Sequence, residues 1–182
     1  MTYRFAVQAS SPGRLGCFDA DDVSLSDAIQ TVFPLEAEYA LIVWNWIYVP
    51  LSYKYDLSFM AEDLIALIGA MISEPAGHRV IQWASNTFAG TWIVDWGGER
   101  TTVHATWDCV LGNTEGQLNA KPTIIVETGQ FLGEWRRPLE VIVAALDAAG
   151  YTTARIASLA PMRQIVESID HYGILYGEPA GP

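Results

Sequence analysis

The sequence predicts a single α+β domain, in which a mainly antiparallel sheet of about five to six strands is covered by two main helices plus one or two short ones. Several short segments alternate apolar and polar residues, as strands do, and two longer segments repeat apolar residues at helical spacing. Turn signals separate the strand-like segments by only a few residues, which favours antiparallel pairing. No repeat or linker divides the 182 residues, so we expect one domain at 1–177 and a loose tail at 178–182.

The N-terminal region is expected to form two strands and a helix. Residues 3–8 can form a first strand, and residues 15–19 a short second strand after a Ser-Pro-Gly turn. Ser24 and Asp27 have the spacing of a capping box, with Asp in place of the usual Glu. The helix that they open is expected to end before Pro34, because the residue before a proline is disfavoured in the helical region.

Residues 38–49 form the clearest predicted strand. Both of its faces are apolar, which indicates a central strand covered on both sides, and Pro50 is expected to end its pairing. Asp56 or Ser58 can then cap a helix that runs to about Ser73. Six apolar residues share one face of that helix: Leu57, Met60, Leu64, Leu67, Ile68 and Met71.

The middle of the chain is expected to form an antiparallel meander. Its three strands are predicted at 79–84, 91–96 and 100–110. The pair Gly97-Gly98 is a hairpin signal between the second and third strands. A loop at 112–116 and a further short strand at 123–127 follow.

The last part of the chain is expected to contain two helices. The first spans about 131–149, where Pro138 would kink the helix or delay its start and Gly150 suits the position just after its end. Pro161 can open a last helix that ends at Gly173.

The cysteines and the N-terminus indicate a cytoplasmic protein. Cys17 and Cys109 lie 92 positions apart without metal-binding or redox spacing, so we expect two buried, reduced thiols. The N-terminus lacks the basic and apolar regions of a secretory signal. The longest near-apolar run, residues 39–51, has 13 residues, whereas a membrane-spanning helix needs about 18. We therefore expect no membrane partner.

No catalytic, metal-binding or cofactor-binding motif is present. The sequence contains neither a glycine-rich phosphate loop nor a GxSxG nucleophile elbow, and no two of its three histidines have the spacing of a metal pair. We expect no enzyme, no metal ion and no cofactor. One enzymatic or ligand-binding alternative stays open: a cleft near His104, with Thr102, Thr106 and Asp108 on the same strand face.

Acidic residues are concentrated in one third of the chain. The chain carries 21 acids and 10 Lys or Arg, a net charge of -11, which disfavours a nucleic-acid partner because phosphates are bound by clustered bases. From Leu15 to Gly77 the only base is Lys54. The same segment contains ten acids: Asp19, Asp21, Asp22, Asp27, Glu36, Glu38, Asp56, Glu62, Asp63 and Glu74.

The same third holds five aromatic residues: Trp44, Trp46, Tyr48, Tyr53 and Tyr55. A field of one sign accelerates association with an oppositely charged partner, and aromatic side chains anchor protein interfaces. Such a surface can imitate the nucleic acid that a basic enzyme binds. The candidate binding residues are Asp19, Asp21, Asp22, Glu36, Glu38, Tyr53, Tyr55 and Asp56.

The chain resembles the immunity proteins of bacterial polymorphic toxin systems, such as contact-dependent growth inhibition. Four segments carry the resemblance and cover about two thirds of the chain: Trp44-Asn45-Trp46-Ile47-Tyr48, Tyr53–Phe59, the meander Trp83–Trp107, and Phe131–Trp135 with its helix to Gly150. The resemblance implies a small cytoplasmic α+β protein that binds one cognate toxin, often a nuclease, and occludes its active site. We expect a basic toxin domain as partner and a monomer or weak dimer.

A second interpretation is an acidic secretion chaperone, another class of small α+β protein. Such a chaperone would bind an extended effector segment along an apolar groove and would be a stable homodimer. Its oligomeric state distinguishes it from a monomeric immunity protein.

Overall fold

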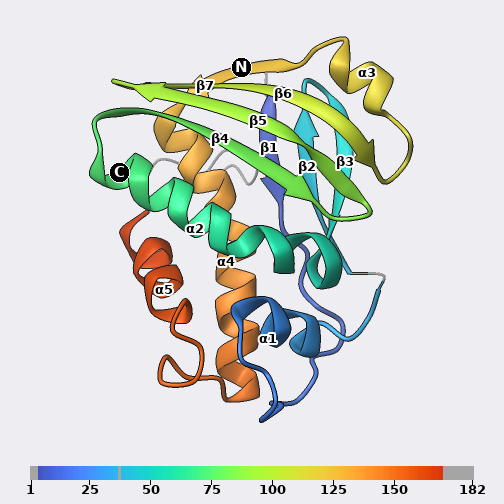
Figure 1. The fold of residues 1–182 in the computed structure, drawn as a ribbon, viewed down its shortest axis with the longest axis vertical. Coiled ribbons are helices and arrows are strands. Elements are labelled where there is room, and N and C mark those ends of the chain that lie inside the picture. Colours follow the sequence, from blue (N-terminus) through green and yellow to red (C-terminus); the bar gives the residue numbers. More distant parts are fainter. Residues whose placement is uncertain (1–3, 37, 170–182) are drawn as a thin grey trace, which may run out of the picture.

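The computed structural model describes residues 4–36 and 38–169, and it confirms the α+β class (Figure 1). In these residues seven strands form two antiparallel sheets, ordered β1-β2-β3 and β4-β5-β6-β7. The strands are β1 (Phe5–Gln8), β2 (Tyr39–Trp44), β3 (Ile47–Ser52), β4 (Ala76–Ala84), β5 (Phe88–Gly97), β6 (Arg100–Val110) and β7 (Thr123–Glu127). The helices are α1 (Leu25–Val32), α2 (Ser58–Ser73), α3 (Glu115–Asn119), α4 (Thr128–Ala149) and α5 (Leu159–Ser168), with a π-helical turn η1 (Tyr53–Leu57) before α2.

Helices α2 and α4 lie on one side of the four-stranded sheet. Figure 1 shows α2 and α4 beneath that sheet, the three-stranded sheet beside α4, and α1 and α5 farther from the four-stranded sheet. Side chains on β5 accordingly alternate between a buried inner face, with Trp92 and Val94, and an outer face with exposed Asp95. None of the described helices covers the outer face in Figure 1.

The capping box of α1 is confirmed. Ser24 Oγ accepts the Asp27 N–H at 3.1 Å, and Asp27 Oδ2 accepts the Ser24 N–H at 3.1 Å. The hydrogen bond from Ser24 lowers the pKa of Asp27, because it stabilises the charged carboxylate. Helix α1 ends at Val32, before Pro34 as predicted.

The short strand predicted at residues 15–19 is wrong. The Gly16 N–H donates to the carbonyl oxygen of Val32 at 2.8 Å, so this segment bonds to the end of α1. A Cβ atom at Gly16 would collide with the carbonyl oxygen of Thr31, which explains glycine at this close approach. The backbone N–H of Asp19 donates to Tyr151 Oη at 3.1 Å.

The single strand predicted at residues 38–49 is also wrong, because the chain reverses at Asn45-Trp46. Both residues have positive φ, 47° and 73°, and Trp44 pairs with Ile47 across the turn. This is the backbone of a tight two-residue hairpin, whose twist matches that of the flanking strands. The reversal moves Trp46 and Tyr48 out of the core, and their side chains are 57% and 63% exposed.

Pro50 does not end the pairing of β3. It lies inside the strand, opposite Leu41 on β2. Strand β3 is an edge of its sheet, where a residue without an N–H can be accommodated.

The predicted apolar face of α2 is confirmed. All six apolar residues predicted for α2 are buried, and α2 ends at Ser73. Helix α4 starts at Thr128 and includes Pro138, and Gly150 follows it with φ 94°, in the left-handed region that favours glycine. Helix α5 begins at Leu159, so Pro161 is its third residue, and the predicted end at Gly173 lies outside the described residues, as does the predicted tail at 178–182.

A cluster of aromatic rings fills the space between the two sheets and α4. Six of the seven tryptophans are buried, and Trp92 lies at the centre of their ring contacts. Its ring centroid is 5.3 Å from Trp44 on β2, 5.8 Å from Trp107 on β6 and 6.2 Å from Trp135 on α4. The cluster therefore joins both sheets and one helix in one core.

The structure also bears on the expectations for the cysteines and for a membrane-spanning helix. Both cysteines are free thiols, but Cys17 is exposed and Cys109 is half-buried, so the expectation of buried thiols is wrong for Cys17. Among the described residues, no helix is both long enough and apolar enough to span a bilayer.

Helix α4 covers the outer edge of β1 with polar side chains. Glu134 is fully buried, and its Oε2 accepts the Val7 N–H at 2.8 Å, while Gln130 Nε2 donates to the Phe5 carbonyl at 3.1 Å. These bonds satisfy backbone groups that an edge strand would otherwise leave unpaired. Burial raises the pKa of Glu134, against the opposing effects of the Val7 N–H and of Arg137.

Glu134→Gln is expected to change the pH dependence of stability. Because the folded pKa of Glu134 lies above its ordinary value of 4.5, the folded chain holds this proton more tightly than the unfolded chain. The contribution of Glu134 to stability is therefore present below about pH 4.5 and is lost as the pH rises through the folded pKa. Urea unfolding from about pH 4 to about pH 8 should show Glu134→Gln gaining stability relative to the parent chain as the pH rises, with a plateau above the folded pKa.

The matched control for this experiment is Glu167→Gln, which changes an exposed carboxylate on α5. Its difference from the parent chain is the reference for loss of a carboxylate from the surface. A difference between Glu134→Gln and the parent chain that does not change with pH would contradict the raised pKa.

Candidate protein-binding surface

The eight candidate binding residues separate into two groups. Four of them lie at the surface and stay available to a partner: Asp19, Asp21, Glu36 and Tyr55. The other four are buried and hold the fold together: Asp22, Glu38, Tyr53 and Asp56. A side chain that is buried in the free protein cannot anchor an interface without unfolding, so these four are corrected to structural roles.

Asp56 is fully enclosed, with 0% exposure. Its carboxylate accepts the Ser52 N–H at 2.7 Å, the Thr87 hydroxyl at 2.7 Å and the Ser85 hydroxyl. These bonds connect η1 to the loop between β4 and β5. Asp56 thus stabilises a junction between two segments, and it is neither a helix cap nor a binding residue.

Tyr53 packs its ring on Phe33, with the ring centroids 4.7 Å apart and nearly parallel. Its hydroxyl donates to the carbonyl oxygen of Ser10 at 3.3 Å. Burial of the phenol raises the pKa of Tyr53 to about 12, so the hydroxyl stays neutral. The tyrosine anchors the N-terminal loop from inside the protein.

Glu38 and Asp22 also hold loops in place. Glu38 Oε1 accepts the backbone N–H groups of Gly13 and Arg14, at 2.6 and 3.3 Å. Asp22 accepts the hydroxyl of Tyr151, whose pKa is raised to about 12, first by burial and then by this bond. Both carboxylates therefore satisfy donors within the chain.

The four surface residues come from three segments: Asp19 and Asp21 precede α1, Glu36 follows it, and Tyr55 lies in η1. Asp19 Oδ1 accepts the Asp21 N–H at 2.9 Å, which orders the first segment locally. The Tyr55 hydroxyl on η1 donates to Glu36 Oε1 at 2.6 Å, and this bond raises the pKa of Tyr55. Tyr55 is 37% exposed, so part of its ring is free for contact.

The structure adds two residues of α2 to this surface. Phe59 is 59% exposed on the first turn, and Asp63 lies one turn later. Both line a groove between α2 and β4 that contains two adjoining cavities of about 210 Å³ each, which share Asp63 and Gln82. Phe59 does not belong to the apolar face predicted for this helix. Its position on the helix could therefore have identified it from the sequence as an exposed aromatic ring.

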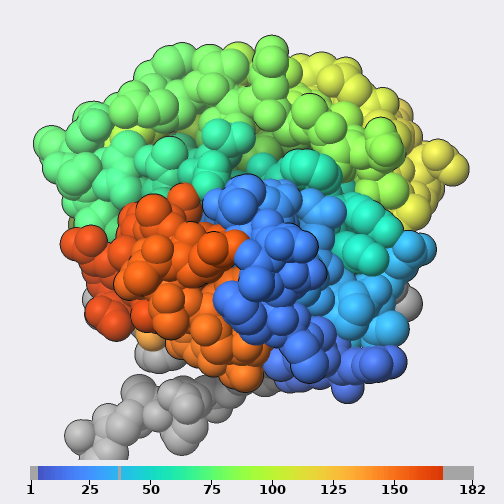
Figure 2. Space-filling model, turned by 60° about the horizontal axis from the view of Figure 1, so that its bottom comes forward, coloured from blue at the N-terminus to red at the C-terminus, as the bar shows by residue number. Residues whose placement is uncertain are grey.

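We call this surface the acidic face; it consists of Asp19, Asp21, Glu36, Tyr55, Phe59 and Asp63. In Figure 2 the blue N-terminal segment meets the teal surface of α2, which borders the green surface of β4. Within the described residues, none of its four carboxylates forms an ion pair. Two bases lie nearby without pairing with these carboxylates: Arg155 donates to the backbone carbonyls of Ala20 and Asp22, and Arg79 lines the same cavity as Asp63.

The alternative cleft near His104 lies on the outer face of the four-stranded sheet. His104 Nδ1 and Thr123 Oγ1 are hydrogen-bonded at 2.9 Å, and His104, Thr106 and Asp108 are exposed. Neither these residues nor Thr102 line the cavities between α2 and β4 or the cavity beside Asn45 and Trp46.

Comparison with protein-family models, curated proteins and solved structures found no match for this chain. Its function has to be inferred from the geometry of its own residues.

Proposed function

We propose that the chain is an immunity protein that binds and neutralises a cognate basic toxin domain, of the nuclease type, without catalysis of its own. The observation that supports the proposal most is the acidic face, which presents four carboxylates without ion pairs together with two exposed aromatic rings. The carboxylates attract the Lys and Arg side chains with which a nuclease binds phosphates. The rings of Tyr55 and Phe59 supply the apolar contact that anchors the complex.

The proposal assigns toxin binding to a partly different set of residues from the sequence-based hypothesis. The four buried residues Asp22, Glu38, Tyr53 and Asp56 are removed from the binding set. Phe59 and Asp63, which come from the same third of the chain and are exposed, are added. Asp19, Asp21, Glu36 and Tyr55 keep the roles predicted for them.

Reversing two charges of the acidic face is expected to slow association with the toxin. In Asp21→Lys/Asp63→Lys both replaced carboxylates make no side-chain hydrogen bond in the described part of the chain, so the fold should be retained. The association rate constant should fall about tenfold at low salt, and its salt dependence should weaken, because electrostatic steering acts mainly on association. Stopped-flow binding to the cognate basic toxin domain measures both quantities.

The matched control is Glu99→Lys/Asp108→Lys, which changes the net charge equally on the four-stranded sheet, where both residues are exposed. If this control slows association as much as the double variant of the acidic face, only net charge matters and the surface assignment is wrong. Unchanged rates and unchanged salt dependence in both variants would reject an electrostatic interface altogether.

The groove between α2 and β4 favours a second candidate, the secretion chaperone. Strand β4 is an edge strand, and Val80 on it is 57% exposed beside the cavities of the groove. An extended effector segment could add to this edge as a further strand. Analytical ultracentrifugation distinguishes the two candidates, because a chaperone of this class is a stable homodimer.

A further inference from the structure

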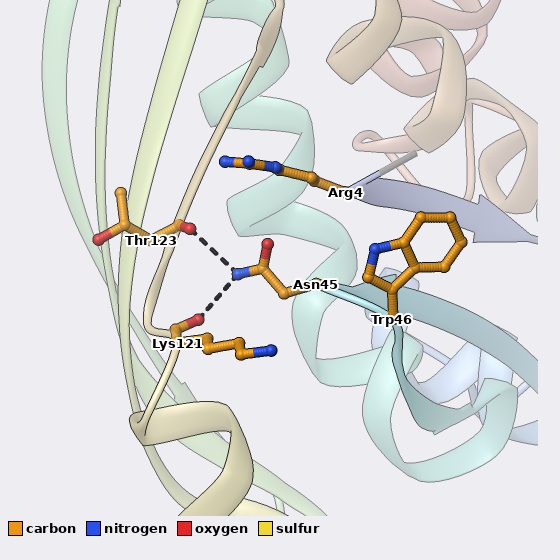
Figure 3. A pocket seen from close by; sticks show the side chains of 5 residues that line it. All are labelled: Arg4, Asn45, Trp46, Lys121 and Thr123. Atoms are coloured by element: carbon orange, nitrogen blue, oxygen red, sulfur yellow. Dashed lines mark hydrogen bonds between the residues drawn. The ribbon is translucent and has the colours of Figure 1, made fainter. Parts of the chain in front are cut away.

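A basic cavity lies at the tip of the β2–β3 hairpin, apart from the acidic face. Its volume is about 340 Å³, and its lining consists of Arg4, Asn45, Trp46, Lys121 and Thr123 (Figure 3). The cavity combines two of the ten bases of the chain with no acidic residue. In a chain with a net charge of -11, this local excess of positive charge is opposite in sign to the whole molecule.

The floor of the cavity is fixed by hydrogen bonds. Asn45 Nδ2 donates to the carbonyl oxygens of Lys121 and Thr123, at 2.9 and 3.1 Å. The Asn45 N–H donates to the Arg4 carbonyl at 2.7 Å, and Trp44 Nε1 donates to the Lys121 carbonyl at 3.1 Å. Three distant segments are thereby held together before any ligand arrives, which lowers the cost of binding one.

Trp46 occupies a position where a smaller residue would be more stable. Its φ of 73° lies in the left-handed region, which is unfavourable for a bulky side chain, and glycine is preferred at this turn position. Its ring is 57% exposed, so burial in the core does not compensate the strain. Backbone strain of this kind is concentrated at functional sites.

The cations of the cavity are available to an anion. Within the described residues neither Arg4 nor Lys121 forms an ion pair. Figure 3 shows their side chains extending from opposite sides, with Asn45 between them and the indole ring of Trp46 alongside. A guanidinium and an ammonium can bind the oxygens of one phosphate, and an exposed indole can stack on a planar ring.

We propose that this cavity binds a small phosphorylated ligand that carries a planar ring, of the nucleoside monophosphate class. Arg4 and Lys121 bind the phosphate, and Trp46 stacks on the ring. The cavity volume lies in the usual range of small-molecule sites. This site is independent of toxin binding, because its charge is opposite to that of the acidic face and it shares no residue with it.

Titration calorimetry with adenosine 5′-monophosphate, adenosine and inorganic phosphate tests the proposal. The monophosphate should bind at least about tenfold more tightly than either fragment, because only it engages both the cations and the ring. Arg4→Met and Lys121→Met should each weaken its binding at least about tenfold. Arg14→Met is the matched control, because Arg14 is an exposed base beyond the other end of β1, and it should bind as the parent chain does.

The role of Trp46 in binding is tested by a separate measurement. Its indole N–H signal in a proton–nitrogen spectrum, identified by its loss in Trp46→Phe, should shift on addition of the monophosphate. Trp46→Gly should lose most of the affinity for the monophosphate without a fall in melting temperature, since glycine relieves the strain at φ 73°. A variant that loses binding while staying as stable as the parent chain separates a binding role from a structural one.

Three results would overturn the site. Unchanged affinity in both Arg4→Met and Lys121→Met would show that these two side chains do not bind the phosphate. An unmoved Trp46 signal, or equal affinities for the monophosphate and for inorganic phosphate, would overturn the stacking role. The absence of heat and of shifts at millimolar monophosphate would reject the cavity as a binding site.

Discussion

Asp56→Ala is expected to lower the free energy of unfolding by about 3–5 kcal/mol. The substitution removes a fully buried carboxylate that accepts the Ser52 N–H at 2.7 Å and the Thr87 hydroxyl at 2.7 Å, in addition to the Ser85 hydroxyl. Hydrogen bonds to charged groups contribute more than neutral ones, and the three donors would lose their acceptor in a space that excludes water. The junction between η1 and the β4–β5 loop would lose its central connection.

Urea unfolding at neutral pH measures this loss. Asp56→Asn keeps the size of the side chain and one carbonyl acceptor, so it should cost less, about 1–2 kcal/mol. The exposed residue Asp108 supplies the matched control, and Asp108→Ala should stay within about 0.5 kcal/mol of the parent chain. A cost below about 1 kcal/mol for Asp56→Ala would show that water or neighbouring groups replace the carboxylate.

The elements that follow from the sequence are those encoded by local patterns. The capping box of Ser24 and Asp27 lies within four residues, and the buried face of α2 follows from helical periodicity. Strand β7 has the predicted bounds, 123–127. Gly150 was predicted from its residue type, because few other residues tolerate its φ of 94°.

The hairpin at Asn45-Trp46 shows where this approach fails. A two-residue turn with positive φ is normally signalled by glycine, and here tryptophan takes that position. Residues 38–49 therefore read as one continuous apolar strand. Tryptophan at a turn position that favours glycine makes the turn unrecognisable in the sequence. The same unfavourable backbone conformation supports a function for Trp46.

The candidate surface was predicted only in part, because burial depends on contacts between distant segments. Asp22 is bonded by Tyr151, 129 positions away, and Asp56 by Ser85, 29 positions away. No local pattern distinguishes these buried acids from exposed Asp19 or Asp21. The basic cavity was missed for the same reason, since Arg4, Asn45 and Lys121 meet only in the folded chain.

The second large effect is expected in the aromatic core. Trp92→Ala should lower the free energy of unfolding by about 3–5 kcal/mol, the usual range for removal of a buried large aromatic side chain. The Trp92 ring contacts rings from the other sheet and from α4, with centroids 5.3 Å from Trp44 and 6.2 Å from Trp135. A cavity at this point would loosen the contact between both sheets and the helix, and the rigid surroundings would not fill it.

Two further variants are compared with Trp92→Ala: Trp92→Phe is a milder change at the same site, and Trp46→Ala is the exposed control. The indole N–H of Trp92 has no hydrogen-bond partner among the described residues, so phenylalanine removes an unpaired buried donor together with part of the apolar area. These effects oppose each other, and we expect a loss of about 1–2 kcal/mol for Trp92→Phe. Trp46→Ala removes an exposed ring and should stay within about 0.5 kcal/mol of the parent chain.

Urea unfolding followed by far-ultraviolet circular dichroism measures all three variants without relying on the fluorescence of the altered tryptophans. If Trp92→Ala fails to fold, Trp92→Phe still reports on the same ring contacts. Equal losses for Trp92→Ala and Trp46→Ala would show that the ring cluster does not connect the two sheets. A large loss at Trp92 with none at Trp46 would mean that the hairpin tip can be altered freely, and binding at the tip can then be tested without disturbing the fold.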